Sequence, residues 1–350
     1  MKKNILIKLT TIAFLLLILS MFSCSKENMN LSNLNDTFFL RHKNADMPVN
    51  IYGNGSEKVF LIILHGGPGD QGLGYRITPF VEEIEKNNAV VYFDQRGSGS
   101  SQGNYSKKDL SVDLMAEDVL ALAKLIKAKY GNDSKLFLMG HSWGGTLGTA
   151  TLLKNQNPFL GWIEVCGGHN MFGGYELYKQ LLPQTANEQI VLGNSVDFWQ
   201  NIIDEVKNIG PDYSTENHLA LNTLANSTGS VLAQDGIINK SQVELADKTP
   251  ISNGLLNIWN MRKTGKILDF QEGLNLIDFT NRLNEITIPS LVLWGKHDLT
   301  VPLALGIEAY DNLGSSEKDI FIFEKSAHGP MNTEPDLFAN KMIEFINKHK

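Results

Sequence analysis

Three residues of the chain have the types and the order needed for covalent catalysis by a serine. Ser142 lies in Gly140-His-Ser-Trp-Gly144, a G-x-S-x-G pattern, and Asp298 and His328 follow it along the chain. A serine hydroxyl is a weak nucleophile until an adjacent base takes its proton, and a carboxylate must hold that base in one tautomer. We assign the nucleophile to Ser142, the base to His328 and the orienting acid to Asp298, which predicts acyl transfer through an acyl-enzyme.

Acyl transfer also needs hydrogen-bond donors aimed at the oxyanion that forms on the substrate. The backbone N–H of Trp143, directly after the serine, is one candidate. The second is expected from His65-Gly-Gly-Pro-Gly69, where the glycines allow the backbone to turn its amides inward. In this loop Gly67 is the first choice for the donor and Gly66 is the second.

Other polar residues near these motifs have simpler expected roles. His297 adjoins Asp298, but a base and its orienting acid face each other most readily from different loops, so we expect His297 to be a loop residue. His141 and His65 are expected to pack or form hydrogen bonds beside the serine and the glycine loop. The pair Asp94 and Arg96, in a second glycine-rich turn, is expected to hold its own loop in place.

The strands that must position these residues are short apolar runs of the kind buried in a parallel sheet. In such a sheet, functional groups gather on the loops beyond the carboxyl ends of the strands. The glycine loop, the serine, the aspartate and the histidine each follow one of these runs. The predicted strands are Val59–Leu64, Ala89–Phe93, Leu136–Met139, Trp162–Cys166, Leu291–Trp294 and Ile320–Phe323.

Two further kinds of element frame the predicted sheet. An antiparallel hairpin is expected at its edge, formed by Thr37–Arg41 and Pro48–Tyr52 across a polar turn. The pattern Ser106-x-x-Asp109 predicts the capped start of a long helix that ends at Gly131, and a last helix should begin near Pro335.

The alternation of strands and helices is lost between His169 and about Thr287. A structureless loop of that length is improbable in a compact domain. We therefore expect a core made of residues 36–168 and 288–350, with a helical cap inserted at 169–287. The predicted fold class is α/β, with a mostly parallel sheet flanked by helices.

Residues 1–23 have the composition of an export signal. Two lysines precede an apolar stretch, Thr10–Phe22, that is short for a membrane span. Cys24 follows a small residue at the end of this stretch, which resembles the cleavage and acylation site of bacterial lipoproteins. We expect a lipid attached at Cys24, a tether over residues 24–35, and a protein anchored in the cell envelope. A plain secretory signal or an uncleaved anchor is the alternative.

Charge and cysteine content restrict the partners of the chain. The formal net charge is −7, and it becomes −10 without residues 1–23, which hold three lysines and no acid. This balance argues against nucleic acid or anionic lipid headgroups as partners. The second cysteine, Cys166, lies in an apolar run and is expected to be a packing residue. The sequence contains no C-x-x-C or H-E-x-x-H pattern, so we expect neither a metal nor a cofactor.

Three motifs together resemble the proline iminopeptidase (prolyl aminopeptidase) branch of the α/β-hydrolase fold. The similarity covers roughly residues 36–168 and 288–350. It implies a helical cap over the site and removal of an N-terminal residue, often proline, from peptides or amides. The motifs are His65-Gly-Gly-Pro-Gly69, Asp94-Gln-Arg-Gly-Ser-Gly-Ser-Ser101 and Gly140-His-Ser-Trp-Gly-Gly145.

Members of this branch hold the free amino group of the substrate with carboxylates of the cap, commonly in a Trp-x-x-Trp-Glu setting. This sequence lacks that setting, because Trp199 and Trp259 are each followed by an amide residue. Other cap acids could serve instead, although each could equally be part of a solvated helix face. These candidates for substrate binding are Glu176, Asp204, Glu205 and Glu244.

The sequence therefore predicts an exported serine hydrolase that acts on small substrates. An aminopeptidase that releases N-terminal residues from peptides is the leading interpretation. An esterase, lactonase or amidase acting on a non-peptide substrate is the first alternative, and a binding lipoprotein on a retired hydrolase scaffold is the second. Serine at position 142 argues against epoxide hydrolases and haloalkane dehalogenases, which resemble this fold but use aspartate there.

Overall fold

The computed structural model describes residues 30–210, 212–243, 259–260 and 277–350. Residues 1–29 lie outside this part of the chain, so the export signal and Cys24 stay predictions. Within the described residues, no helix combines the length and apolar character that a membrane span requires.

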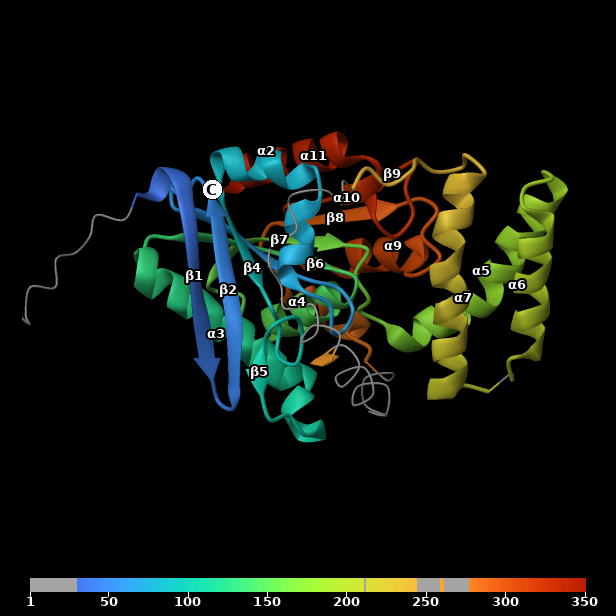
Figure 1. Ribbon diagram of the computed structural model, residues 1–350, viewed down its shortest axis with the longest axis horizontal. Coiled ribbons are helices and arrows are strands. Elements are labelled where there is room, and N and C mark those ends of the chain that lie inside the picture. The colour runs from blue at the N-terminus through green and yellow to red at the C-terminus, as the bar shows by residue number, and fades with distance from the viewer. Residues whose placement is uncertain (1–29, 211, 244–258, 261–276) are drawn as a thin grey trace, which may run out of the picture. The chain divides into compact units, whose positions relative to one another are not determined.

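In the described part of the chain, a nine-stranded, mostly parallel sheet forms the centre (Figure 1). Its order is β1-β2-β4-β3-β6-β7-β8-β9, and the short β5 pairs with β2. Every pair from β4 to β9 along this order is parallel. The strands are β1 Leu34–His42, β2 Ala45–Gly53, β3 Val59–Leu64, β4 Ala89–Phe93, β5 Gln102–Gly103, β6 Lys135–His141, β7 Phe159–Val165, β8 Ser290–Gly295 and β9 Lys318–Phe323.

The predicted hairpin and the predicted parallel strands are confirmed. β1 and β2 pair antiparallel over their whole lengths, from Leu34 with Gly53 to His42 with Ala45. The central strands β3, β4 and β8 are buried at every position, which explains why their sequences are unbroken apolar runs rather than alternating patterns.

Helices cover both faces of the sheet. α2 and α11 pack against each other on one face, and α3 and α4 pack against each other on the other (Figure 1). The helices of the core are α2 Phe80–Asn87, α3 Val112–Tyr130, α4 Trp143–Lys154, α9 Leu303–Asn312, α10 Pro330–Thr333 and α11 Pro335–His349. The 3-10 turns are Leu31–Asn33, Gly72–Ile77, Lys107–Leu110 and Thr280–Glu285.

The predicted start of the long helix is wrong by one turn. Ser106 and Asp109 do form a capping box, but it caps the 3-10 turn Lys107–Leu110. α3 begins only at Val112, where the Ser111 hydroxyl accepts the N–H of Leu114. Two capping serines five residues apart allow two starts, and the chain uses both for successive turns. The predicted end is confirmed, because Gly131 closes α3 with a φ of 119°.

Three long helices form the described part of the predicted cap. They are α5 Met171–Val191, α6 Val196–Asn208 and α7 Thr215–Gln234, and they lie together at the right of Figure 1. We call their shared apolar cluster the cap core. It consists of Tyr175, Tyr178, Leu182, Ala186, Trp199, Ile202, Ile203, Leu221, Ala225, Leu232 and Ile238 of the cap, with Leu299 and Ala327 of the sheet loops.

The last two members of the cap core lie beside predicted catalytic residues. Leu299 follows Asp298 and Ala327 precedes His328, and both apolar side chains are buried. The cap therefore packs directly on the two loops that carry the predicted acid and base.

Candidate active site

Ser142 lies at the tight turn between β6 and α4. It is not a glycine, yet its φ is 56° and its ψ is −120°, a conformation that side chains rarely adopt. The turn is fixed by backbone hydrogen bonds, from Ser142 N–H to Val165 O at 3.0 Å and from Gly145 N–H to Ser142 O at 2.8 Å. Strain of this kind is found where the surrounding structure holds a functional group in place, and it matches a nucleophile elbow.

Two glycines of the G-x-S-x-G pattern are required because backbones pass very close at this turn. A Cβ on Gly140 would lie 2.2 Å from Gly144 O, and a Cβ on Gly144 would lie 2.0 Å from Leu64 O. Neither backbone oxygen can move without disturbing the first turn of α4 or the end of β3. The pattern is therefore set by packing around the serine as well as by its backbone conformation.

The predicted base and acid are in contact. His328, on the loop between β9 and α10, places Nδ1 at 2.8 Å from Asp298 Oδ2. Asp298 Oδ1 accepts the N–H groups of Thr300 and Val301 at 2.8 and 2.9 Å, and the carboxylate is fully buried. A carboxylate can only accept, so Nδ1 carries the proton, and Nε2 of a neutral His328 is left as the basic nitrogen.

A buried hydrogen-bond chain connects the glycine loop to the His328 loop. His141 Nε2 donates to the carbonyl oxygen of His328 at 2.8 Å, since a carbonyl can only accept. Desolvation lowers the pKa of His141 to about 3, so its ring is neutral, and its Nδ1 accepts a hydrogen bond from the Tyr75 hydroxyl at 2.6 Å. The Tyr75 oxygen in turn accepts the Gly66 N–H at 3.1 Å.

This hydrogen-bond chain shows which of the three predicted oxyanion donors is already occupied. The N–H of Gly66 is directed to Tyr75, so it is not free to meet an oxyanion in this conformation. Trp143 is the first residue of α4, where an N–H has no partner within the helix. Gly67 has a φ of 117° in the loop beside the serine. The N–H groups of Gly67 and Trp143 remain the predicted pair, and Gly66 positions the loop.

The Asp94–Ser101 segment supports the turn that carries Ser142. Gln95 accepts the indole N–H of Trp143 at 2.9 Å and donates to His65 O at 2.9 Å. Arg96 is fully buried and makes two hydrogen bonds with Asp118, at 2.8 and 2.7 Å. Asp94 accepts backbone N–H groups of its own and a neighbouring loop. These contacts agree with the supporting role expected for the motif.

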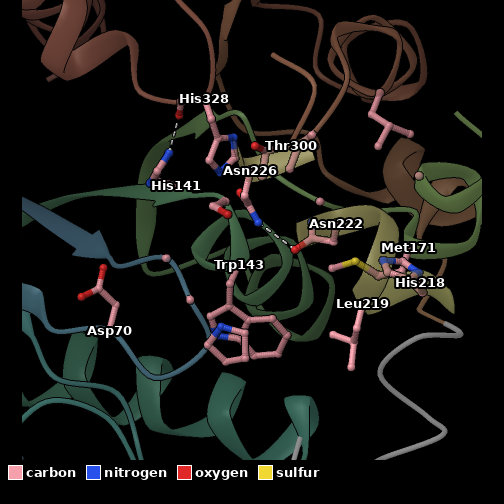
Figure 2. Close-up of a pocket in the computed structure, with 18 of the residues that line it drawn as sticks. Asp70, His141, Trp143, Met171, His218, Leu219, Asn222, Asn226, Thr300 and His328 are labelled. Carbon is pink, nitrogen blue, oxygen red and sulfur yellow. Dashed lines mark hydrogen bonds between the residues drawn. The ribbon is translucent and has the colours of Figure 1, made fainter. Parts of the chain in front are cut away.

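A cavity of about 450 Å³ opens above the serine, between the sheet loops and the cap helices (Figure 2). This volume suits a ligand of the size of one or two amino acids. Ser142 and His328 both line it. The other lining residues are Gly66, Gly67, Pro68, Asp70, Tyr75, His141, Trp143, Gly168, Asn170, Met171, Gly174, Tyr178, His218, Leu219, Asn222, Asn226, Thr300, Val301 and Leu305.

The described cap acids lie away from this cavity. Glu176, Asp204 and Glu205 are exposed on the outer surfaces of α5 and α6, and none of them lines the cavity. Glu244 lies outside the described residues. Among the described lining residues, Asp70 is the one acid, and it is exposed. The structure therefore gives no support to substrate binding by the first three of these acids.

α7 turns toward the cavity a polar face that was not predicted from the sequence. His218, Asn222 and Asn226 are spaced by four residues, so they share one side of the helix, and all three line the cavity (Figure 2). The spacing is visible in the sequence. However, uncharged polar residues at helical spacing are also typical of a solvated face, and only the docking of the cap distinguishes the two.

Cys166, Asp298 and His328 offer ligand atoms within 4.8 Å of one another. Burial raises the pKa of the Cys166 thiol well above its usual value, which disfavours the thiolate that binds metals. The carboxylate and imidazole are already paired with each other. This group fits an orienting acid and a base better than a metal site.

Comparisons with known proteins agree with this geometry. The family model described as alpha/beta hydrolase fold matches residues 59–207. The probable aminopeptidase YbaC of Bacillus subtilis is 27% identical over 318 residues, covering 87% of this chain and 94% of its own. The proline iminopeptidase of Saccharolobus solfataricus is 29% identical over 296 residues, covering 82% of this chain and 84% of its own.

A solved structure supports the same fold. The crystal structure of the proline iminopeptidase from Mycobacterium smegmatis superposes with a TM-score of 0.61 at 16% identity, over 90% of this chain and 98% of that one. The protein is thus an α/β-hydrolase-fold enzyme, a hydrolase. Within that fold, its sequence is similar to those of a probable aminopeptidase and a proline iminopeptidase over more than four fifths of each chain.

Proposed function

We propose that this hydrolase is an aminopeptidase that releases N-terminal residues from short peptides through an acyl-enzyme on Ser142. The observation that carries the proposal is the contact of His328 with buried Asp298 at one cavity with the strained Ser142. Relatives named aminopeptidase and proline iminopeptidase, each matched over more than four fifths of its length, support the substrate class.

The mechanism follows from the donors and acceptors of the site. His328 Nε2 takes the Ser142 proton while the oxygen attacks the scissile carbonyl, and the N–H groups of Gly67 and Trp143 stabilise the oxyanion. The protonated His328 then gives its proton to the leaving amine. Water, deprotonated by the same nitrogen, attacks the acyl-enzyme and releases the N-terminal residue, which restores Ser142.

Three substrates test the proposal on the purified enzyme. They are an aminoacyl p-nitroanilide with a free amine, its N-acetyl form, and a p-nitrophenyl ester of a short fatty acid. An aminopeptidase should hydrolyse the first, including the prolyl and alanyl versions, and lose this activity when the amine is acetylated. Turnover of the ester alone would replace the aminopeptidase with an esterase, lactonase or amidase. A failure of a fluorophosphonate probe to label Ser142 would favour a binding protein.

We also propose that the enzyme is exported and anchored in the cell envelope by a lipid on Cys24. The sequence of residues 1–24 supports this proposal. Each buried CH₂ of an acyl chain contributes about 0.8 kcal/mol to membrane binding. An acidic protein surface cannot replace this contribution when the acyl chains are lost. Cys24→Ser should therefore move the protein from the membrane fraction to the soluble fraction. Unchanged fractionation, or a mature N-terminus at another residue, would contradict the anchor.

A further inference from the structure

A second hydrogen-bond chain runs from the cap to the loop that holds Asp298. Asn226 Nδ2 lies 2.9 Å from Asn222 Oδ1, and Asn222 Nδ2 lies 2.8 Å from the Tyr178 hydroxyl. The Tyr178 hydroxyl lies 2.5 Å from the carbonyl oxygen of Thr300. All four residues line the cavity.

The direction of this chain is fixed by its last member. The Thr300 carbonyl can only accept, so the Tyr178 hydroxyl must donate to it. The Tyr178 oxygen is then an acceptor for Asn222, which must present its NH₂ group there and its oxygen to the next residue. Asn226 must therefore donate its own NH₂ to Asn222. Each orientation follows from the one before.

The last group of this hydrogen-bond chain, the amide oxygen of Asn226, is consequently an acceptor. With its nitrogen committed to Asn222, Asn226 keeps its amide oxygen available, and within the described residues no donor meets this oxygen. Figure 2 shows the nitrogen of Asn226 turned toward Asn222 and its oxygen toward the side on which His328 lies. The cavity thus holds an oriented hydrogen-bond acceptor on the cap side of the site.

The surroundings suit a cationic donor. An ammonium group offers three donors and no acceptor, so it pairs with oxygens and is repelled by cations. The neighbouring His218 does not supply such a cation at neutral pH, because burial lowers its pKa to about 4. Asp70 adds one negative charge among the described lining residues.

We propose that the Asn226 amide oxygen, oriented through Asn222 and Tyr178, binds the α-ammonium group of the substrate and makes Asn226 a specificity-determining residue. This inference rests on the proposed aminopeptidase function. It assigns amine recognition to a polarised amide, since the described cap acids expected from the sequence, Glu176, Asp204 and Glu205, do not line the cavity. The Thr300 N–H also donates to Asp298, so one loop orients both the amine-binding chain and the acid that holds His328.

Two substitutions of Asn226 distinguish the effect of its acceptor oxygen from the effect of the rest of the side chain. Asn226→Leu removes the acceptor, whereas Asn226→Asp keeps an acceptor and gives it a negative charge. The matched control is Asn201→Asp, which adds the same charge at an exposed position of α6 outside the cavity. Each variant is assayed with the free-amine p-nitroanilide and the p-nitrophenyl ester, and a thermal melt checks folding.

We expect Asn226→Leu to raise KM for the free-amine substrate by about tenfold, the usual cost of losing a hydrogen bond to a charged group. Its kcat/KM for the ester should stay within about twofold of wild type. Asn226→Asp should keep or lower the KM for the free amine, and Asn201→Asp should leave both substrates unchanged. An Asn226→Leu enzyme with a wild-type KM for the free amine would overturn the inference.

The outcomes distinguish a failure of the proposed role of Asn226 from a failure of the proposed aminopeptidase function. If the wild-type enzyme hydrolyses no free-amine substrate, the aminopeptidase proposal fails and the inference fails with it. If the wild type prefers the free amine but Asn226→Leu loses ester and amide activity equally, Asn226 supports the site structurally and the inference alone fails. If Asn226→Leu melts at a low temperature, Asn226→Thr and Asn226→Ala are compared in its place. Asn226→Thr keeps an acceptor and should therefore retain more free-amine activity than Asn226→Ala.

Discussion

At the scale of single residues, the site depends on which atom of each buried group is a donor. Three carbonyl or carboxylate oxygens determine these assignments: Asp298 Oδ2 for the ring of His328, His328 O for the ring of His141, and Thr300 O for Tyr178. Each oxygen can only accept, so each sets the orientation of the side chain that follows. The base is held through its ring by Asp298 and through its backbone by His141.

Removal of the nucleophile or the base should abolish turnover without unfolding the protein. Ser142→Ala and His328→Ala should each lower kcat for the preferred substrate by about 10⁴-fold or more, because the groups act as a unit. Steady-state assays with thermal melts measure both properties. A variant that keeps near-wild-type turnover would show that its residue has another role.

A buried carboxyl group behind the site predicts a stability change with pH. Glu164 in β7 is fully buried, and desolvation raises its pKa to about 7. Because the unfolded value is lower, the folded state binds more protons between pH 4.5 and 7, and the free energy of unfolding falls as the pH rises through that window. Glu164→Gln removes this loss.

The measurement is the melting temperature of wild type and Glu164→Gln at pH 5 and pH 8. The variant should gain a few degrees on the wild type between the two pH values, since about 1 kcal/mol corresponds to about 2–4 °C for a domain of roughly 150–250 residues and to less for a longer chain. His141, whose lowered pKa makes stability fall toward acid pH, is common to both proteins and cancels. An equal difference at both pH values would mean that Glu164 does not titrate there.

The two kinds of site residue differ in how far the sequence could predict them. Ser142 lies in a pattern required by backbone packing, and Asp298 and His328 follow strands in a known order, so local sequence was informative. Asn222 and Asn226 depend on how α7 docks over the sheet. That docking is decided by apolar contacts between distant segments, and no local pattern encodes it.

At the scale of elements, the turn between β6 and α4 brings three backbone segments close together: β3, β6 and α4. Gly144 lies against Leu64 at the end of β3, so the glycine loop after β3 and the serine are brought together by the same contact. The positions of the parallel strands and of the last helix were predictable because period and composition are local properties. The start of α3 was not, because Ser106 and Ser111 are both competent caps and only the 3-10 turn between them distinguishes their uses.

Two glycine-to-alanine substitutions should have opposite effects on stability. Gly144→Ala places a methyl group 2.0 Å from Leu64 O and should destabilise the protein by more than about 3 kcal/mol or prevent folding. Gly229→Ala, in the middle of α7 with no atom within 4 Å of the new Cβ, should stabilise it by about 0.5–1 kcal/mol. Denaturant unfolding of the purified variants checks both. A stable Gly144→Ala protein would contradict the close approach.

At the scale of the whole described chain, the cap and the sheet share buried surface. The cap core includes Leu299 and Ala327, which adjoin Asp298 and His328. The cap therefore does more than cover the cavity, because it contributes to the packing of the loops that carry the predicted acid and base. The predicted boundaries of the cap at 169 and 287 lie close to the end of β7 and the start of β8, with residues 244–258 and 261–276 outside the described part of the chain.

A cavity made in the cap core should therefore affect activity and stability together. Trp199→Ala, at a fully buried position of α6, should cost about 3–5 kcal/mol. Residual activity and near-UV circular dichroism should be lost over the same temperature range, because the cap and the catalytic loops lose one common core. Leu192→Ala, at an exposed position, is the control and should change neither. Cap melting below the temperature at which activity is lost would show that the two are independent.

The contact of Leu299 and Ala327 with the cap also limits how this enzyme can be recombined with its relatives. A cap taken from another hydrolase would bring its own apolar surface, shaped for different neighbours on the two loops. Such a chimera would inherit a mismatch next to Asp298 and His328, however well its cavity suited the new substrate. Exchange of the cap should succeed only when positions 299 and 327 are exchanged with it, so the unit that can be transferred is the cap together with both loops.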